Sequence, residues 1–188
     1  MSFVVARRGL VRATLSLAAL SIAALAPATG FAHGPSRQKV TETIEIAAPA
    51  EKVWAVVGNF QDLGWLPAVA KTEGTGGNEA NKATRHITLQ NGGEIDELLT
   101  KYDAADFTLA YRIEKVDVKV LPVNNYSSTL TVKPQGDKSV VEWKGAFYRG
   151  FPNNDPPPEL SDEAALKAVT DLYKSGLAAL KAKVESGK

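Results

Sequence analysis

Apolar and polar residues alternate along seven stretches of the chain, which predicts a domain dominated by β-strands. In the first stretch, residues 39–46, Val40, Ile44 and Ile46 share one side, as expected for a strand with one buried face. The other six strands are predicted at residues 69–74, 83–89, 94–102, 107–116, 126–132 and 140–148. Turn sequences, such as Asn91-Gly92-Gly93, separate several of them and favour antiparallel hairpins.

Two short segments after the first strand follow a helical pattern instead. A helix is expected between Pro49 and Gly58, with Trp54 on its apolar side. Residues 60–66 predict a second short helical turn, which Pro67 would stop.

The last predicted helix determines the fold class, because no other helix is long enough to cover a face of the sheet. It is expected over residues 162–184, with Ser161 as its N-cap. Its apolar residues recur at intervals of three and four: Leu166, Val169, Tyr173, Leu177 and Leu180. We therefore expect an α+β domain in which a curved antiparallel sheet wraps on this helix. Imperfect closure between the helix and the sheet would leave a ligand cavity.

The first 32 residues have the pattern of an export signal. Three arginines precede an uncharged run of small and apolar residues, 13–26, which is too short for a bilayer-spanning helix of about 20 residues. Small residues in Gly30-Phe31-Ala32 predict cleavage before His33. We expect a signal peptide at 1–32 and a single periplasmic domain at 33–188, with no membrane span after cleavage. An uncleaved membrane anchor is the alternative.

Charge and composition narrow the possible functions. Removal of the signal would leave 19 Lys and Arg against 21 Asp and Glu, so the mature domain has no basic surplus for binding nucleic acid. The chain has no Cys, which excludes disulfides and covalent haem attachment. It also lacks the HExxH, GxSxG, Walker and GxGxxG motifs, so we expect no catalytic residues, metal or cofactor.

The chain has two histidines, and each leaves an alternative open. His86 lies in the middle of a predicted strand and would act as an acid or base if it faced the cavity; a hydrogen-bonded or solvent-facing side chain is favoured, because no second catalytic group is fixed beside it. His33 at a mature N-terminus would offer copper an amine and an imidazole, with His86 as a third ligand. A flexible tail is the simpler expectation.

Charged residues in two of the predicted strands are also open to two interpretations. Alternation places Glu94 and Asp96 on one side of their strand and Glu97 on the other, and the first two are expected to be solvated rather than an acid–base or cation site. Arg112 and Glu114 share a face and are expected to form a surface ion pair rather than a charge at the cavity mouth.

Aromatic side chains are the better candidates for the cavity. Tyr and Trp combine an apolar body with one polar tip that can orient a ligand. Together with His86, the candidates are Trp65, Tyr102, Tyr111, Trp143, Phe147 and Tyr148.

Residues 151–160 are expected to dock a partner or to serve as a rigid connector. Three consecutive prolines hold an extended conformation that loses little entropy on binding. Phe151 and Leu160 would anchor the partner, and Asp155 and Glu159 would meet basic groups. A second candidate surface is 117–125, with Val118, Val120 and Val123 beside Lys119.

The order of elements, together with short motifs, resembles the START-like, or SRPBCC, superfamily in its polyketide cyclase/dehydrase branch. The motifs are APAEKVW (48–54), GNF (58–60), WLP (65–67), ELL (97–99), YD (102–103) and YSSTL (126–130). The resemblance covers residues 37–184 and implies a helix-grip fold. More narrowly, the export signal with residues 115–132 and 143–160 resembles MxaD-like periplasmic proteins.

The narrower resemblance implies a non-enzymatic accessory of methanol oxidation, with the periplasmic quinoprotein methanol dehydrogenase or its cytochrome as partner. This is the leading hypothesis for the function. A carrier or sensor of a small hydrophobic ligand is the second. A cyclase- or hydrolase-type enzyme, using His86 and cavity carboxylates, is the third.

Overall fold

The computed structural model describes Met1 and residues 34–187. Apart from Met1, the expected signal peptide and its cleavage site lie outside the described residues, as does His33. Among the described residues, no helix has both the length and the apolar character needed to cross a membrane.

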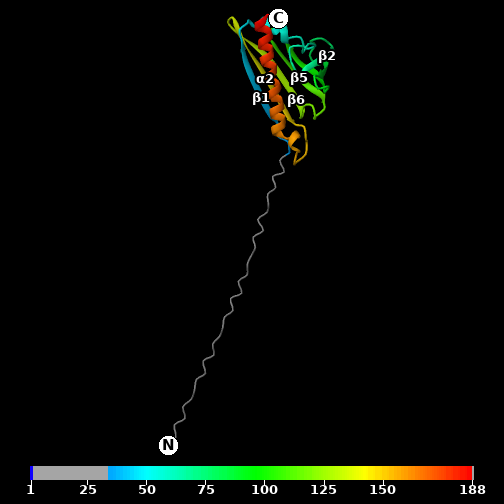
Figure 1. The fold of residues 1–188 in the computed structure, drawn as a ribbon, viewed down its shortest axis with the longest axis vertical. Coiled ribbons are helices and arrows are strands. Elements are labelled where there is room, and N and C mark those ends of the chain that lie inside the picture. The colour runs from blue at the N-terminus through cyan, green and yellow to red at the C-terminus, as the bar shows by residue number, and fades with distance from the viewer. Residues whose placement is uncertain (2–33, 188) are drawn as a thin grey trace. The chain divides into compact units, whose positions relative to one another are not determined.

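A seven-stranded antiparallel sheet and one long helix form the domain (Figure 1). The elements in chain order are β1 (Gln38–Ile46), α1 (Ala50–Val57), β2 (Val69–Thr75), β3 (Thr84–Leu89), β4 (Glu94–Asp103), β5 (Thr108–Val116), β6 (Val123–Gln135), β7 (Lys138–Arg149), the 3₁₀ turn η1 (Pro158–Leu160) and α2 (Asp162–Ser186). The strand order is β1-β7-β6-β5-β4-β3-β2, so the first strand closes against the last. This architecture confirms the predicted fold class.

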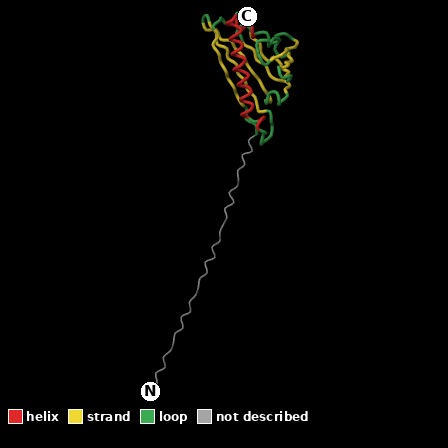
Figure 2. Tube along the Cα trace, in the orientation of Figure 1, coloured by secondary structure: helices red, strands yellow, loops and turns green. Residues whose placement is uncertain are grey.

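The sheet curves because several strands pair irregularly. The register between β4 and β5 shifts at Asp96/Glu97 and again at Leu99/Lys101, and that between β6 and β7 shifts at Asn124/Ser127. Such bulges bend a strand and increase its twist. The concave face produced in this way receives α2, which runs along the sheet in Figure 2.

Helix α2 begins and ends at the residues that its sequence favours. Ser161 caps the first turn by accepting a hydrogen bond from the backbone N–H of Ala164 at 3.2 Å. Gly187 ends the helix with φ of 70°, a conformation that suits glycine. The buried stripe faces β1 and β7 and comprises Ala165, Val169, Tyr173, Gly176, Leu177, Leu180 and Val184. Gly176 allows α2 to pack closely against Leu66, because a Cβ at residue 176 would lie 2.6 Å from the Leu66 side chain.

The segment after α1 differs from a regular helix. Residues 60–68 form a series of turns, with backbone hydrogen bonds from Leu66 to Leu63 and from Val69 to Leu66. Gly64 and Pro67 interrupt the run, so no continuous ladder of helical bonds forms. These turns carry Leu63 and Leu66 to the inner face of the sheet.

Candidate ligand cavity

A cavity of about 250 Å³ lies between the concave face of the sheet and α2. Strands β3 to β7 form most of its wall, the turns after α1 and the loop at 120–121 add to it, and two α2 residues complete it. Most of the lining side chains are aliphatic: Leu63, Leu66, Val69, Ile87, Leu89, Ile95, Ile113, Val120, Leu121 and Leu172. The wall is therefore largely apolar, as in most small-molecule sites.

A buried ion pair, Arg85 with Glu97, interrupts this apolar wall. The two residues face each other across β3 and β4, and the Nε and Nη2 atoms of Arg85 both lie 2.6 Å from Oε2 of Glu97. Each is less than a tenth exposed. Nη1 of Arg85 donates to the backbone oxygen of Phe60 at 2.8 Å, and the guanidinium lies 4.1 Å from the centre of the Phe60 ring. The arginine is thus fixed from two sides.

The surroundings of Glu97 favour its neutral form relative to a carboxyl in water. Burial raises the pKa of Glu97, and the charge and hydrogen bond of Arg85 oppose this shift without cancelling it. The site therefore combines one cation with a carboxylate that is costly to desolvate.

A network of hydroxyl groups lies next to the ion pair at the base of the cavity. The hydroxyls of Tyr126 and Tyr173 are 2.5 Å apart, and Oγ of Ser128 is 2.9 Å from the latter. Trp143 donates from Nε1 to Ser128 at 2.9 Å and to the Tyr111 hydroxyl at 3.2 Å. Because these polar atoms bond to one another, they can be buried at little cost.

Two of the seven predicted cavity residues line the cavity. Tyr111 and Trp143 do so, from β5 and β7. Trp65 lies behind the wall, where its ring packs against Trp143 at 5.6 Å. Phe147 is fully buried and stacks on Tyr126 at 6.0 Å, so it belongs to the core.

Two further predicted cavity residues, Tyr102 and Tyr148, do not line the cavity, and we correct their assignment. Tyr102 packs against Trp54 of α1 at 5.7 Å, away from the cavity lining. Tyr148 projects from the opposite face of β7 to Phe147, and Arg37 lies 5.6 Å above its ring. Strand alternation directs Tyr148 to the outer face, whereas Tyr102, paired with Leu109 of β5, shares the inner face but packs on α1.

His86 lies on the outer face of β3, so the structure does not provide the base that a cyclase- or hydrolase-type mechanism would take from it. Its Nδ1 lies 2.6 Å from Oδ1 of Asp96, and its side chain is 38% exposed. The hydrogen bond to Asp96, followed by the charges of Asp96, Glu94 and Glu73, raises the pKa of His86. Glu94 and Asp96 are solvated as alternation predicts, and Arg112 pairs with Glu114 on the surface.

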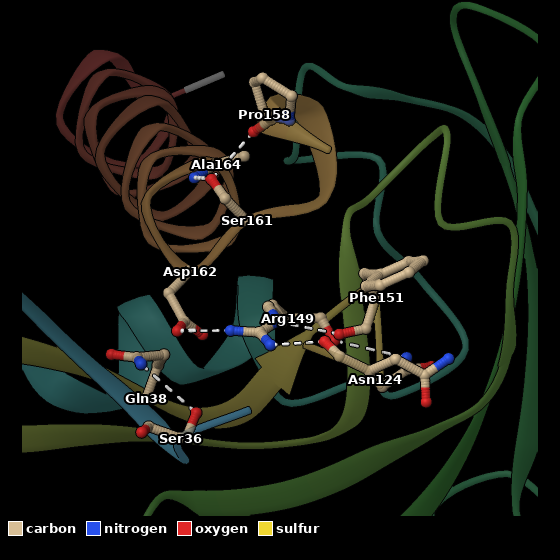
Figure 3. A network of polar contacts seen from close by, with 10 residues as sticks. Ser36, Gln38, Asn124, Arg149, Phe151, Pro158, Ser161, Asp162 and Ala164 are labelled. Atoms are coloured by element: carbon tan, nitrogen blue, oxygen red, sulfur yellow. Dashed lines mark hydrogen bonds and ion pairs between the residues drawn. The ribbon is translucent and has the colours of Figure 1, made fainter. Parts of the chain in front are cut away.

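The predicted docking segment, 151–160, is held in place by buried Arg149 (Figure 3). This side chain donates from Nε to the backbone oxygen of Phe151 at 2.9 Å and from Nη2 to that of Asn153 at 2.7 Å. Its Nη1 bonds Asp162 of α2 at 3.1 Å. The segment is therefore fixed between the end of β7 and the start of α2, with Asp155 and Glu159 exposed.

The two candidate surfaces, 117–125 and 151–160, meet at one end of the domain. Gly150 donates its N–H to the backbone oxygen of Pro122 at 2.7 Å, and a Cβ at residue 150 would lie 3.1 Å from Cβ of Val118. Val120 from the first surface also lines the cavity. The combined surface thus borders the cavity wall.

The sequence interpretation missed Arg85 and did not assign Glu97 to the cavity. A signal for both exists, because Arg85 alternates in phase with Ala83, Ile87 and Leu89 on the buried face. Glu97 is likewise in phase with Ile95 and Leu99. Two opposite charges at inward positions of one hairpin are expensive to bury unless they pair, so they mark a buried ion pair.

Comparisons with known proteins agree with this architecture. Residues 37–185 match the family model described as polyketide cyclase / dehydrase and lipid transport. The chain is 32% identical to an uncharacterised protein from Bacillus thuringiensis, covering 78% of this chain and 98% of that one with a TM-score of 0.66. It is also 32% identical to the protein XoxI from Bacillus cereus, covering 78% and 94% with a TM-score of 0.65.

A more distant structure shares the fold alone. Norcoclaurine synthase from Thalictrum flavum, solved with dopamine and hydroxybenzaldehyde, is 20% identical; 82% of this chain and 90% of that one are covered, with a TM-score of 0.62. No curated protein matches the chain.

Proposed function

Because the chain belongs to the polyketide cyclase/dehydrase and lipid transport family, we propose that it is a non-enzymatic binding protein whose cavity takes a small apolar ligand. The observation that carries this proposal is the 250 Å³ cavity between the sheet and α2, with its aliphatic wall. An apolar cavity of about 150 Å³ is enough to bind benzene. A ligand of one substituted ring, or a short branched chain, therefore fits the available space.

The placement of the titratable groups supports binding rather than acid–base catalysis. Arg85 and Glu97 line the cavity but are engaged with each other, and His86 lies on the outer face. Burial raises the pKa of the tyrosines at the cavity base, so their hydroxyls stay protonated at neutral pH. These groups are suited to orienting a ligand.

The experiment that tests the proposal is native mass spectrometry of the protein purified from its own cells. We expect a bound small molecule in the wild type and its loss in Ala168→Phe, which places a ring in the cavity from α2. Ala178→Phe is the matched control, because Ala178 is exposed on the same helix. A ligand-free wild type, or equal ligand in both variants, would contradict the proposal.

A second candidate function is an accessory role in methanol oxidation after export to the periplasm. The resemblance to MxaD-like proteins rests on residues 115–132 and 143–160 together with the expected export signal. The structure brings the loops of these two runs together at one end of the domain. A surface held by Arg149 and built from both runs supports docking to a protein such as the dehydrogenase or its cytochrome.

This second function is tested by affinity capture from periplasmic extract of cells grown on methanol. We expect the dehydrogenase or cytochrome to be recovered, and recovery to fall in Phe151→Ala and Leu160→Ala. Phe107→Ala is the control, because Phe107 packs on Trp54 at the opposite end of β5. Recovery of neither protein, or equal loss in all variants, would argue against docking at this surface.

A further inference from the structure

The ion pair in the cavity leaves one oxygen of Glu97 free for a ligand. Both close nitrogens of Arg85 lie against Oε2, whereas Oε1 accepts no hydrogen bond from any residue that the structure describes. Among the described residues, Oε1 is not one of the polar atoms that are both fully enclosed and without a hydrogen-bond partner, and Glu97 lines the cavity while being almost closed to bulk solvent. The open side of Oε1 therefore faces the cavity.

The charge balance of the cavity restricts what can bond to that oxygen. Arg85 and Glu97 are its two charged lining residues, and they neutralise each other. A ligand carboxylate would leave a net negative charge in an apolar space, and a ligand ammonium would leave a net positive one. Burying an unpaired charge is far more costly than burying a hydroxyl that finds a partner.

We infer that the cavity selects a neutral ligand with one hydroxyl group, such as a substituted phenol or a small alcohol, which donates a hydrogen bond to Oε1 of Glu97. This inference rests on the proposed binding function and names its ligand class. The aliphatic wall contacts the apolar body of the ligand, and the carboxylate of Glu97 accepts the hydrogen bond from its hydroxyl. The cavity volume limits the body to about the size of one substituted ring.

Isothermal titration with four probes that share one body tests this preference at neutral pH. The probes are propylbenzene, 4-propylphenol, 4-propylbenzoate and 4-propylbenzylamine. A hydrogen bond to a charged group contributes about 1.5–3 kcal/mol, so 4-propylphenol should bind at least about tenfold more tightly than propylbenzene. The benzoate and the benzylamine should bind more weakly than the phenol.

Glu97→Gln should reverse part of this selectivity. The neutral amide is a weaker acceptor and leaves Arg85 without its counter-charge, so the phenol should lose most of its advantage and the benzoate should gain about tenfold or more. Glu94→Gln is the matched control, because it makes the same change on the exposed face of the same strand and should leave the order of the probes unchanged. Thermal melting checks that both variants fold.

The outcomes separate this inference from the proposed function. Binding of no probe would contradict the proposed function itself. Equal binding of propylbenzene and 4-propylphenol to the wild type, or tighter binding of the benzoate or benzylamine, would overturn the hydroxyl preference while leaving the binding function intact. The wild-type series decides the question even if Glu97→Gln does not fold.

Discussion

The hydroxyl of Tyr173 in α2 lies directly against Gly145 in β7: a Cβ at residue 145 would come within 2.4 Å of the tyrosine oxygen. The same hydroxyl contacts Tyr126 and Ser128, so a glycine on the strand and three hydroxyls fix where the helix rests on the sheet. The cavity borders this contact, since Tyr126 also lines it. The position of α2 and the shape of the cavity therefore depend on the same few atoms.

Gly145→Ala is expected to destabilise the domain by about 1–3 kcal/mol, because the added methyl group forces Tyr173 out of a tightly packed site. Urea unfolding measures the loss. Adding Tyr173→Phe to this variant should recover part of the lost stability, because it removes the hydroxyl oxygen with which the new methyl group clashes. Gly34→Ala, where a Cβ meets nothing within 4 Å, should be neutral. A Gly145→Ala domain as stable as the wild type would contradict this packing.

Arg85→Met is expected to cost about 3–5 kcal/mol, because it leaves Glu97 buried without a partner. The double variant Arg85→Met/Glu97→Leu should recover most of that loss, since neither charge then remains in the apolar wall. Chemical unfolding of the single and double variants gives both numbers. A double variant as unstable as the single one would show that the pair does more than neutralise charge.

Stability should fall as the pH rises above about 10, the ordinary pKa of tyrosine. Burial raises the pKa values of Tyr126 and Tyr173 well above that point, so the folded protein keeps protons that the unfolded chain releases. The folded state then binds more protons, and the free energy of unfolding decreases with pH. Unfolding free energies measured on both sides of this pH should show a shallower decrease in Tyr126→Phe. An unchanged slope would contradict the assignment.

Arg149→Met should loosen residues 150–160 without unfolding the sheet, because it removes the two hydrogen bonds to this segment and the ion pair with Asp162 of α2. Hydrogen exchange read by mass spectrometry should show faster exchange in this segment and unchanged exchange in β4 and β5. Arg112→Met is the control, since Arg112 forms an exposed pair with Glu114. Equal exchange in both variants would show that the segment is held by other contacts.

Much of the fold could be predicted from the sequence, because period-two alternation and a long helix with an apolar stripe leave few arrangements open. The ends of the strands could not be predicted. Strands β6 and β7 extend beyond the predicted 126–132 and 140–148, since backbone pairing continues past the apolar residues. The turns at 60–68 also escaped prediction in detail, because their form depends on packing under α2.

The cavity was harder to predict than the fold. Aromatic side chains serve equally well in a core and in a binding site, so their identity alone did not separate Tyr111 from Phe147 or Tyr102. Strand phase places Arg85 and Glu97 inward. It does not separate the aromatics, because Tyr102, Tyr111 and Phe147 all lie on the inner face of the sheet. What no pattern along the chain could give is which inward residues border empty space, because that depends on how far the helix stands from the sheet.

The most direct test of the central claim, that the cavity binds a small apolar molecule, is an amide NMR titration of the wild-type domain with propylbenzene. We predict saturable shifts that concentrate at residues lining the cavity, such as Ile87, Ile95 and Tyr111, and that disappear in Ala168→Phe. Shifts that increase linearly with propylbenzene concentration without saturating, or that spread over the outer face around His86, would contradict the claim.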